Sequence, residues 1–308
     1  MKKKLSLWAL AVATIIVAAT PARAQEVKVF GVLDYAVRST SESTSVVSGS
    51  WRQSRLGVMA SEDLGGGLKA VVHLEGKLDA SNGTLGSTSS TNTLFDRHSS
   101  VALTHAQYGT VKMGRFDISD ASEIDSLAGF GNLGKFTNFL GVTEYGMYKA
   151  GSIGYATPKI GGVTVKVGQS YKTATEASVQ STSATYEIGK FSVGAGYEKK
   201  GAGDQKSTGA KYNFGWAQLG AAYMEEKPST VAPANKIKAV SASIPMGQGF
   251  ALGGVYQTRD NGVGADVDVY TVAVSKDVSK RTRLALVYQD QTGKGPNDFV
   301  QAQIIHSF

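Results

Sequence analysis

Four acidic side chains at the start of one long connection are the residues whose type and spacing most clearly suggest chemistry. They fall close together with no basic residue among them, and apolar residues follow them. Grouped carboxylates give a local negative field, which is one way in which a pore selects ions. A solvated acidic segment with no function is the alternative. The four acids are Asp117, Asp120, Glu123 and Asp125.

Arg55 and Arg115 carry the opposite charge in segments where apolar and polar residues alternate. The alternation predicts that both side chains turn toward the interior of the molecule. Basic residues on a wall that faces the acidic loop would set a transverse field across a narrow passage. The alternative is a salt bridge that only braces the loop.

The remaining reactive residues show no catalytic or metal-binding arrangement. The four histidines, His73, His98, His105 and His306, have no paired ligand spacing within one element, and the chain has no cysteine. Neither a thiolate ligand nor a disulfide is therefore available. No nucleophile motif of the G-x-S-x-G type is present. The sequence predicts no metal, no cofactor and no enzymatic activity.

The charge balance argues against a nucleic-acid partner. The formal net charge is +7, but residues 1–24 carry four of the basic residues and no acid, which leaves +3 for the rest. No basic cluster forms the electrostatic footprint that nucleic-acid binding requires. We therefore expect no nucleic acid among the partners.

Residues 1–24 have the form of a secretory signal peptide. Three lysines precede an apolar run over 5–19, and Ala22-Arg23-Ala24 has the small-residue form of a cleavage site. A membrane anchor is the alternative, but the run is shorter than the roughly 20 apolar residues that a spanning helix needs. We expect the mature protein to begin at Gln25.

Period-two alternation dominates the rest of the chain. It is clear over 27–35 and 284–289, where Leu284, Leu286 and Tyr288 fall on one face. Segments of about ten alternating residues suit tilted strands that cross a membrane. Aromatic residues near both ends of such strands suit the two interfacial girdles of a membrane barrel.

Seven short connections alternate with eight that are longer or more polar, which predicts sixteen strands. Tight turns at one end and longer loops at the other are typical of an outer-membrane barrel. This organisation predicts an all-β, antiparallel transmembrane barrel over residues 25–308, with fourteen strands as the alternative. The longer connections lie near 39–50, 79–94, 117–150, 174–181, 200–206, 226–236, 259–267 and 291–297.

The last segment places Val300, Ala302, Ile304, His306 and Phe308 on one face, and Phe308 is the final residue. A terminal aromatic residue on an amphipathic strand resembles the signal by which barrel-assembly machinery recognises outer-membrane proteins. We therefore expect Phe308 to be an assembly signal.

Several segments together resemble the trimeric general-diffusion porins of Gram-negative bacteria, especially the β-proteobacterial type. The resemblance is sharp up to about residue 170, and the Glu-Asp-Leu-Gly-Gly-Gly turn is its most specific part. Tyr148-Lys149 departs from it, because relatives often have an arginine shortly before the position of Ser152, and Met59 replaces a frequent lysine. The matching segments are 29–34, 54–57, 62–70, 95–97, 109–115 and 151–158.

The resemblance implies a homotrimer in outer-membrane lipid and a third loop, 117–150, folded into the lumen as a constriction. The resemblance also assigns Arg97, together with Arg55 and Arg115, to a basic wall of the pore. An external flap or a trimer contact is the alternative for the loop. We expect passive diffusion of small hydrophilic solutes and ions with weak anion preference. A substrate-selective porin, an outer-membrane enzyme and an adhesin are the alternatives.

Overall fold

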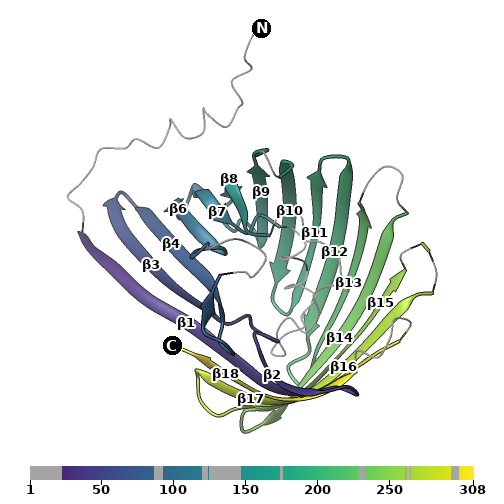
Figure 1. Cartoon of the computed structure of the whole chain (residues 1–308). Helices are drawn as coiled ribbons and strands as arrows, with labels where there is room; N and C mark the ends of the chain where they lie inside the picture. The colour runs from purple at the N-terminus through teal and green to yellow at the C-terminus, as the bar shows by residue number, and fades with distance from the viewer. Residues whose placement is uncertain are drawn as a thin grey trace.

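The computed structural model describes residues 23–86, 93–119, 124, 147–173, 176–228, 233–260, 262–263, 265–292 and 298–308. They form strands that curve around a common interior (Figure 1). Within the described residues, no helix is long and apolar enough to cross a membrane. The strands are β1 (Arg23–Ser39), β2 (Thr44–Ser48), β3 (Arg55–Gly65), β4 (Leu68–Asp79), β5 (Thr84–Leu85), β6 (His98–His105), β7 (Gly109–Phe116), β8 (Lys149–Ala156), β9 (Val163–Ser170), β10 (Val179–Ile188), β11 (Phe191–Lys200), β12 (Gly203–Asn213), β13 (Gln218–Lys227), β14 (Asn235–Gly247), β15 (Phe250–Asp260), β16 (Val267–Asp277), β17 (Thr282–Gln291) and β18 (Phe299–Ser307).

Sixteen of these strands form one closed antiparallel barrel. The short strands β2 and β5 are additions that pair with β1 and β4. β1 pairs with β18 from Val32↔Ser307 to Ser39↔Val300 and with β3 on its other side, so the first and last strands close the ring. The predicted sixteen-stranded barrel is therefore confirmed.

Alternation places polar and small side chains inside the barrel and apolar side chains outside. On β16, Val269 and Thr271 are buried, whereas the neighbouring Tyr270 and Val272 are exposed on the outer surface. The closing strand β18 buries polar Gln301 and Gln303. An apolar outer face and a polar inner face are what lipid on one side and an aqueous lumen on the other require.

The connections also follow the predicted asymmetry, with one correction. The connection expected over 200–206 is wrong, because β11 and β12 pair as far as Lys200↔Gly203 and leave only residues 201 and 202 between them. Inward-facing Gln205 continues the alternation of β12 and is fully buried. The tight turn between β3 and β4 uses Gly65, Gly66 and Gly67, whose φ angles are +82°, +61° and +83°. Glycine adopts this left-handed region without the steric cost that other residues incur.

Exposed aromatic residues mark the two ends of the outer apolar band. Phe191 and Phe250 follow short turns, and Trp216 lies in a third one. Tyr197 and Tyr288 lie toward the loop ends of their strands and are also exposed. These positions match the interfacial girdles of a membrane barrel.

Candidate constriction of the lumen

A single buried carboxylate, Glu75, lies at the centre of the basic wall. Its Oε1 lies 2.5 Å from Nε of Arg97, and its Oε2 lies 3.4 Å from Nε of Arg55. Glu75 is 4 % exposed, so its charge depends on these two cations for compensation. The pairing register explains why Arg55, Glu75 and Arg97 come together. β3 places Arg55 diagonally across from Glu75 on β4, and Glu75 pairs with His98, the residue that follows Arg97 at the start of β6.

Two further side chains hold the Arg97 guanidinium in place. Nη1 donates a hydrogen bond to Oε1 of Gln53, and the guanidinium carbon lies 4.4 Å from the centroid of the Tyr148 ring. Burial raises the pKa of the Tyr148 phenol to about 12, so this residue adds no charge to the site. The sequence did not single out Gln53. The Tyr148-Lys149 departure from the family pattern was the available signal for Tyr148.

His73 and His98 lie together beside this cluster although they are far apart in sequence. Their rings stack with centroids 4.2 Å apart, and one ligand atom from each of His73, His98 and Glu75 falls within 4.8 Å of the others. No spacing within one element predicted this pair, because it forms between β4 and β6. Arg55 and Arg97 already neutralise Glu75, and two adjacent guanidinium groups disfavour a metal cation.

Arg115 lies apart from the group that shares Glu75. Its Nη1 donates to the backbone carbonyls of Tyr148 at 2.6 Å and Asp96 at 3.3 Å. The register pairs it with Ser99, and the outward-facing Met113 lies two residues earlier on β7. By register Arg115 therefore shares a face with Met113 and not with the inward-facing residues, contrary to the prediction from alternation. Its guanidinium joins the segments that precede β6 and β8 through their backbone carbonyls.

The described part of the third loop lies against the inner face of the barrel. Ile118 contacts Gly168 of β9, and Ile124, which is fully buried, contacts Gly209 of β12. Both glycines belong to the inward-facing set of their strands, so the loop enters the lumen there. Asp120, Glu123, Asp125 and the remainder of this loop up to residue 146 lie outside the described residues.

Asp117 is the one loop acid that the structure describes, and its Oδ1 accepts a hydrogen bond from the amide of Ser119 at 2.8 Å. It lines a cavity of about 200 Å³ together with Lys112 and Lys166 from β7 and β9. Its basic neighbours are therefore two lysines. The sequence had suggested the arginine wall instead, and it gave no reason to single out these lysines.

Comparison with known families matches residues 9–296 to the Gram-negative porins. The chain belongs to this family. It is accordingly a multi-pass β-barrel of the outer membrane, and the predicted family and location are confirmed. Outer membrane porin protein 32 of Delftia acidovorans is 32 % identical over 129 residues. That match spans 38 % of this porin and 34 % of the relative, so it covers about a third of the relative's length.

Solved porins share the fold over nearly the whole chain. The anion-selective porin from Comamonas acidovorans has a TM-score of 0.79 at 23 % identity, and the match covers 92 % of this porin and all of that chain. OmpT of Vibrio cholerae, in its trimer form, has a TM-score of 0.73 at 15 % identity over 93 % of this porin and all of that chain. At these identities the likeness establishes the barrel architecture.

Proposed function

We propose that this porin forms a water-filled channel for the passive diffusion of small hydrophilic solutes and ions, with a weak preference for anions. The observation that carries the proposal is the wall cluster inside a closed barrel, where two arginines surround one glutamate. The two guanidinium groups of Arg55 and Arg97 and the carboxylate of Glu75 together carry a net charge of +1. An ion that passes this wall meets an excess of positive charge.

The family and the fold favour a channel over an enzyme, and we extend this to the absence of any catalytic activity. A substrate-selective porin of the same fold is the second candidate, because the cavity at Lys112 and Lys166 offers hydroxyl and ammonium groups to a solute. We also propose that residues 1–24 are a signal peptide that is removed before insertion.

Planar-bilayer recording tests the proposal directly. We expect stepwise conductance increases and, under a salt gradient, a reversal potential displaced modestly toward the anion equilibrium potential. Saturation of the conductance by one solute at millimolar concentration would favour the substrate-selective alternative. A purified, folded barrel that produces no conductance steps would refute channel activity.

We further propose that Phe308 is read by the barrel-assembly machinery. Its ring is partly exposed on the outer face, and its backbone exchanges two hydrogen bonds of 3.1 Å with Gly31. Replacement of Phe308 by alanine keeps these backbone bonds and removes only the aromatic ring. We expect reduced outer-membrane abundance with unchanged export across the inner membrane, measured by fractionation.

Phe308→Tyr is the matched control for this experiment, and it should restore normal abundance because it keeps an aromatic ring at the terminus. Equal outer-membrane levels of the alanine variant and the wild type would show that the ring is not recognised.

A homotrimer is the assembly that we propose. The large apolar side chains exposed on the outer faces of β3, β4, β6 and β7 include Leu56, Val72, Val101 and Met113, and no aromatic residue is among the exposed side chains of these strands. A wall that faces a partner needs no girdle at a lipid interface. The trimer form of Vibrio cholerae OmpT supports the same assembly.

Mass measurement in mild detergent should give three copies of the chain. Val72→Arg should yield monomers, because it places a charge in the proposed interface. Val272→Arg adds the same charge on the outer face of β16 and should leave the trimer intact. A monomeric wild type, or a trimer that tolerates Val72→Arg, would contradict the assembly.

A further inference from the structure

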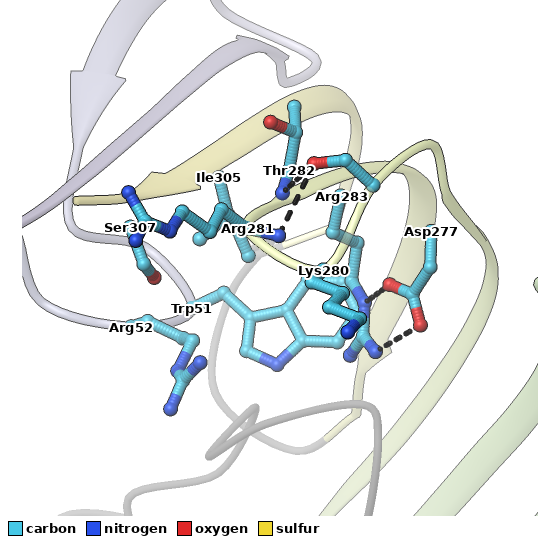
Figure 2. A pocket seen from close by; sticks show the side chains of 10 residues that line it. Trp51, Arg52, Asp277, Lys280, Arg281, Thr282, Arg283, Ile305 and Ser307 are labelled. Atoms are coloured by element: carbon cyan, nitrogen blue, oxygen red, sulfur yellow. Dashed lines mark hydrogen bonds and ion pairs between the residues drawn. The ribbon is translucent and has the colours of Figure 1, made fainter.

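A second basic site lies at the short-turn end of the lumen and adjoins the Glu75 cluster, because Arg55 donates a hydrogen bond of 3.3 Å to the carbonyl of Arg52. It is a pocket of about 570 Å³ between the turn that joins β16 to β17 and the segment that precedes β3. Figure 2 shows Lys280 and Arg283 beside Trp51, Arg281 extending from the same turn toward Ser307, and Arg52 on the segment that carries Trp51. Short turns of outer-membrane barrels face the periplasm, so this pocket lies at the periplasmic mouth.

Asp34 fixes the position of the Trp51-Arg52 segment. Its Oδ2 accepts hydrogen bonds from the amide of Trp51 at 2.7 Å and the amide of Arg52 at 2.6 Å, and its Oδ1 accepts one from Gln303. Asp34 is fully buried. Hydrogen bonds to a charged group in such a site are stronger than neutral ones, so one side of the pocket is rigidly held.

The turn on the opposite side is also preorganised. Oγ of Ser279 accepts hydrogen bonds from the amides of Arg281 at 3.1 Å and Thr282 at 3.0 Å. The carbonyl of Arg281 accepts a hydrogen bond of 2.8 Å from the amide of Ser307 on β18. These bonds hold the backbone that carries Lys280 and Arg281 in one conformation.

The lining carries more positive than negative charge. It contains Arg52, Lys280, Arg281 and Arg283, and Asp277 is the only acid among the lining residues that the structure describes. Asp277 accepts two hydrogen bonds from Arg283, at 2.6 Å and 2.9 Å, as the dashed lines in Figure 2 show. The other three cations remain without a carboxylate in the lining, and their side chains are exposed.

We propose that this pocket binds a small organic anion with two or more negative charges, either a polycarboxylate or a phosphate ester. Guanidinium groups match carboxylate and phosphate oxygens in a bidentate geometry, and the ammonium of Lys280 adds a further donor. The volume lies in the range of sites that enclose small organic ligands. Trp51, which is 3 % exposed, forms part of the pocket wall. The proposal rests on the proposed channel only in placing such anions at the mouth of a permeation path.

Calorimetric titration of the folded protein in detergent tests binding without requiring conductance. The probes are citrate for carboxylates and inorganic pyrophosphate for phosphates, with sodium chloride at matched ionic strength as the reference. We expect saturable heat with at least one of the two probes. Failure of the channel proposal would appear in bilayer recording, whereas failure of this site would appear here as heat no different from that of sodium chloride.

Variants locate the binding. Lys280→Gln combined with Arg281→Gln should raise the dissociation constant at least about tenfold, because hydrogen bonds to charged groups contribute more than 1.4 kcal/mol. Lys190→Gln removes a cation from another short turn and should leave the constant unchanged within about twofold. Equal affinity of the double variant and the wild type would overturn the site.

Tryptophan emission gives a local readout of the same event. Outside residues 1–24 the chain has only Trp51 and Trp216, so Trp216→Phe leaves Trp51 as the single reporter. Its emission should change with the same half-saturation as the heat. Saturable heat with an unchanged Trp51 spectrum in this variant would place the anion elsewhere and overturn the assignment.

Discussion

Replacing Arg55 and Arg97 together by glutamine should convert weak anion preference into cation preference. The wall cluster changes from a net charge of +1 to −1, because only Glu75 remains charged. In a narrow pore this reversal acts on every ion that passes, so the reversal potential under a tenfold salt gradient should change sign. The effect should fade at 1 M salt, where the screening length is about 3 Å.

Two companion variants give a graded series at the same site. Glu75→Gln raises the cluster to +2 and should strengthen the anion preference. The triple variant with glutamine at Arg55, Arg97 and Glu75 is neutral, and its reversal potential should lie between those of the wild type and the double variant. The triple variant also separates selectivity from folding, because it leaves no buried carboxylate without its partners. Such a loss of partners, which the double variant suffers, destabilises a protein by about 3–5 kcal/mol.

Lys159→Gln combined with Lys190→Gln is the control for this series. It also removes two positive charges, but from short turns outside the wall, and it should leave the reversal potential near that of the wild type. Reversal potentials that fail to follow the order of cluster charge would show that permeating ions do not approach Glu75.

Larger side chains at the two glycines that the third loop contacts on the barrel wall should change the single-channel conductance itself. A Cβ atom at Gly209 would lie 2.9 Å from Cγ2 of Ile124, and one at Gly168 would lie 2.7 Å from Cβ of Ile118. These distances are shorter than van der Waals contact, so valine at both positions must displace the loop. Overpacking of this kind costs about 1–3 kcal/mol. We expect a lowered single-channel conductance, because a loop pushed off the inner face of the wall lies further into the lumen and narrows it.

Suppression identifies the cause of the change. Adding Ile118→Gly and Ile124→Ala to the two valine substitutions removes Cβ of Ile118 and Cγ2 of Ile124, the nearest colliding atoms, and should return the conductance toward the wild-type value. Gly254→Val is the control, since a Cβ there has its nearest neighbour at 3.5 Å. Wild-type conductance in the double valine variant would mean that the position of the loop does not depend on its contacts with Gly168 and Gly209.

The barrel could be predicted from sequence because each strand carries its own signal. Leu284, Leu286 and Tyr288 alternate with inward residues within a single strand, and this local pattern needs no knowledge of any neighbour. The error at 200–206 has a physical origin of the same kind. Polar residues fit both a loop and the inner face of a barrel, so a polar strand end reads as a loop.

The site could be predicted only in part, because its contacts depend on the register between strands. His73 and His98 stack because β4 pairs with β6 across an intervening connection, and no spacing within one segment encodes that pairing. The position of Trp51 depends on hydrogen bonds to the buried carboxylate of Asp34, and no pattern within one segment encodes that contact. Family resemblance predicted Arg97, whereas only the structure revealed Glu75, the carboxylate that Arg97 shares with Arg55.

The seam between β1 and β18 makes the barrel dependent on its own completion. Asp34 and Gln303 hydrogen bond across this seam although they are 269 residues apart in the chain. A growing polypeptide exposes its first strand long before the last one exists, and an open strand edge readily pairs with other chains. No shorter product of this chain can therefore be a smaller pore. Truncation removes the closing partner of β1, so any prematurely ended chain becomes a substrate for aggregation or proteolysis.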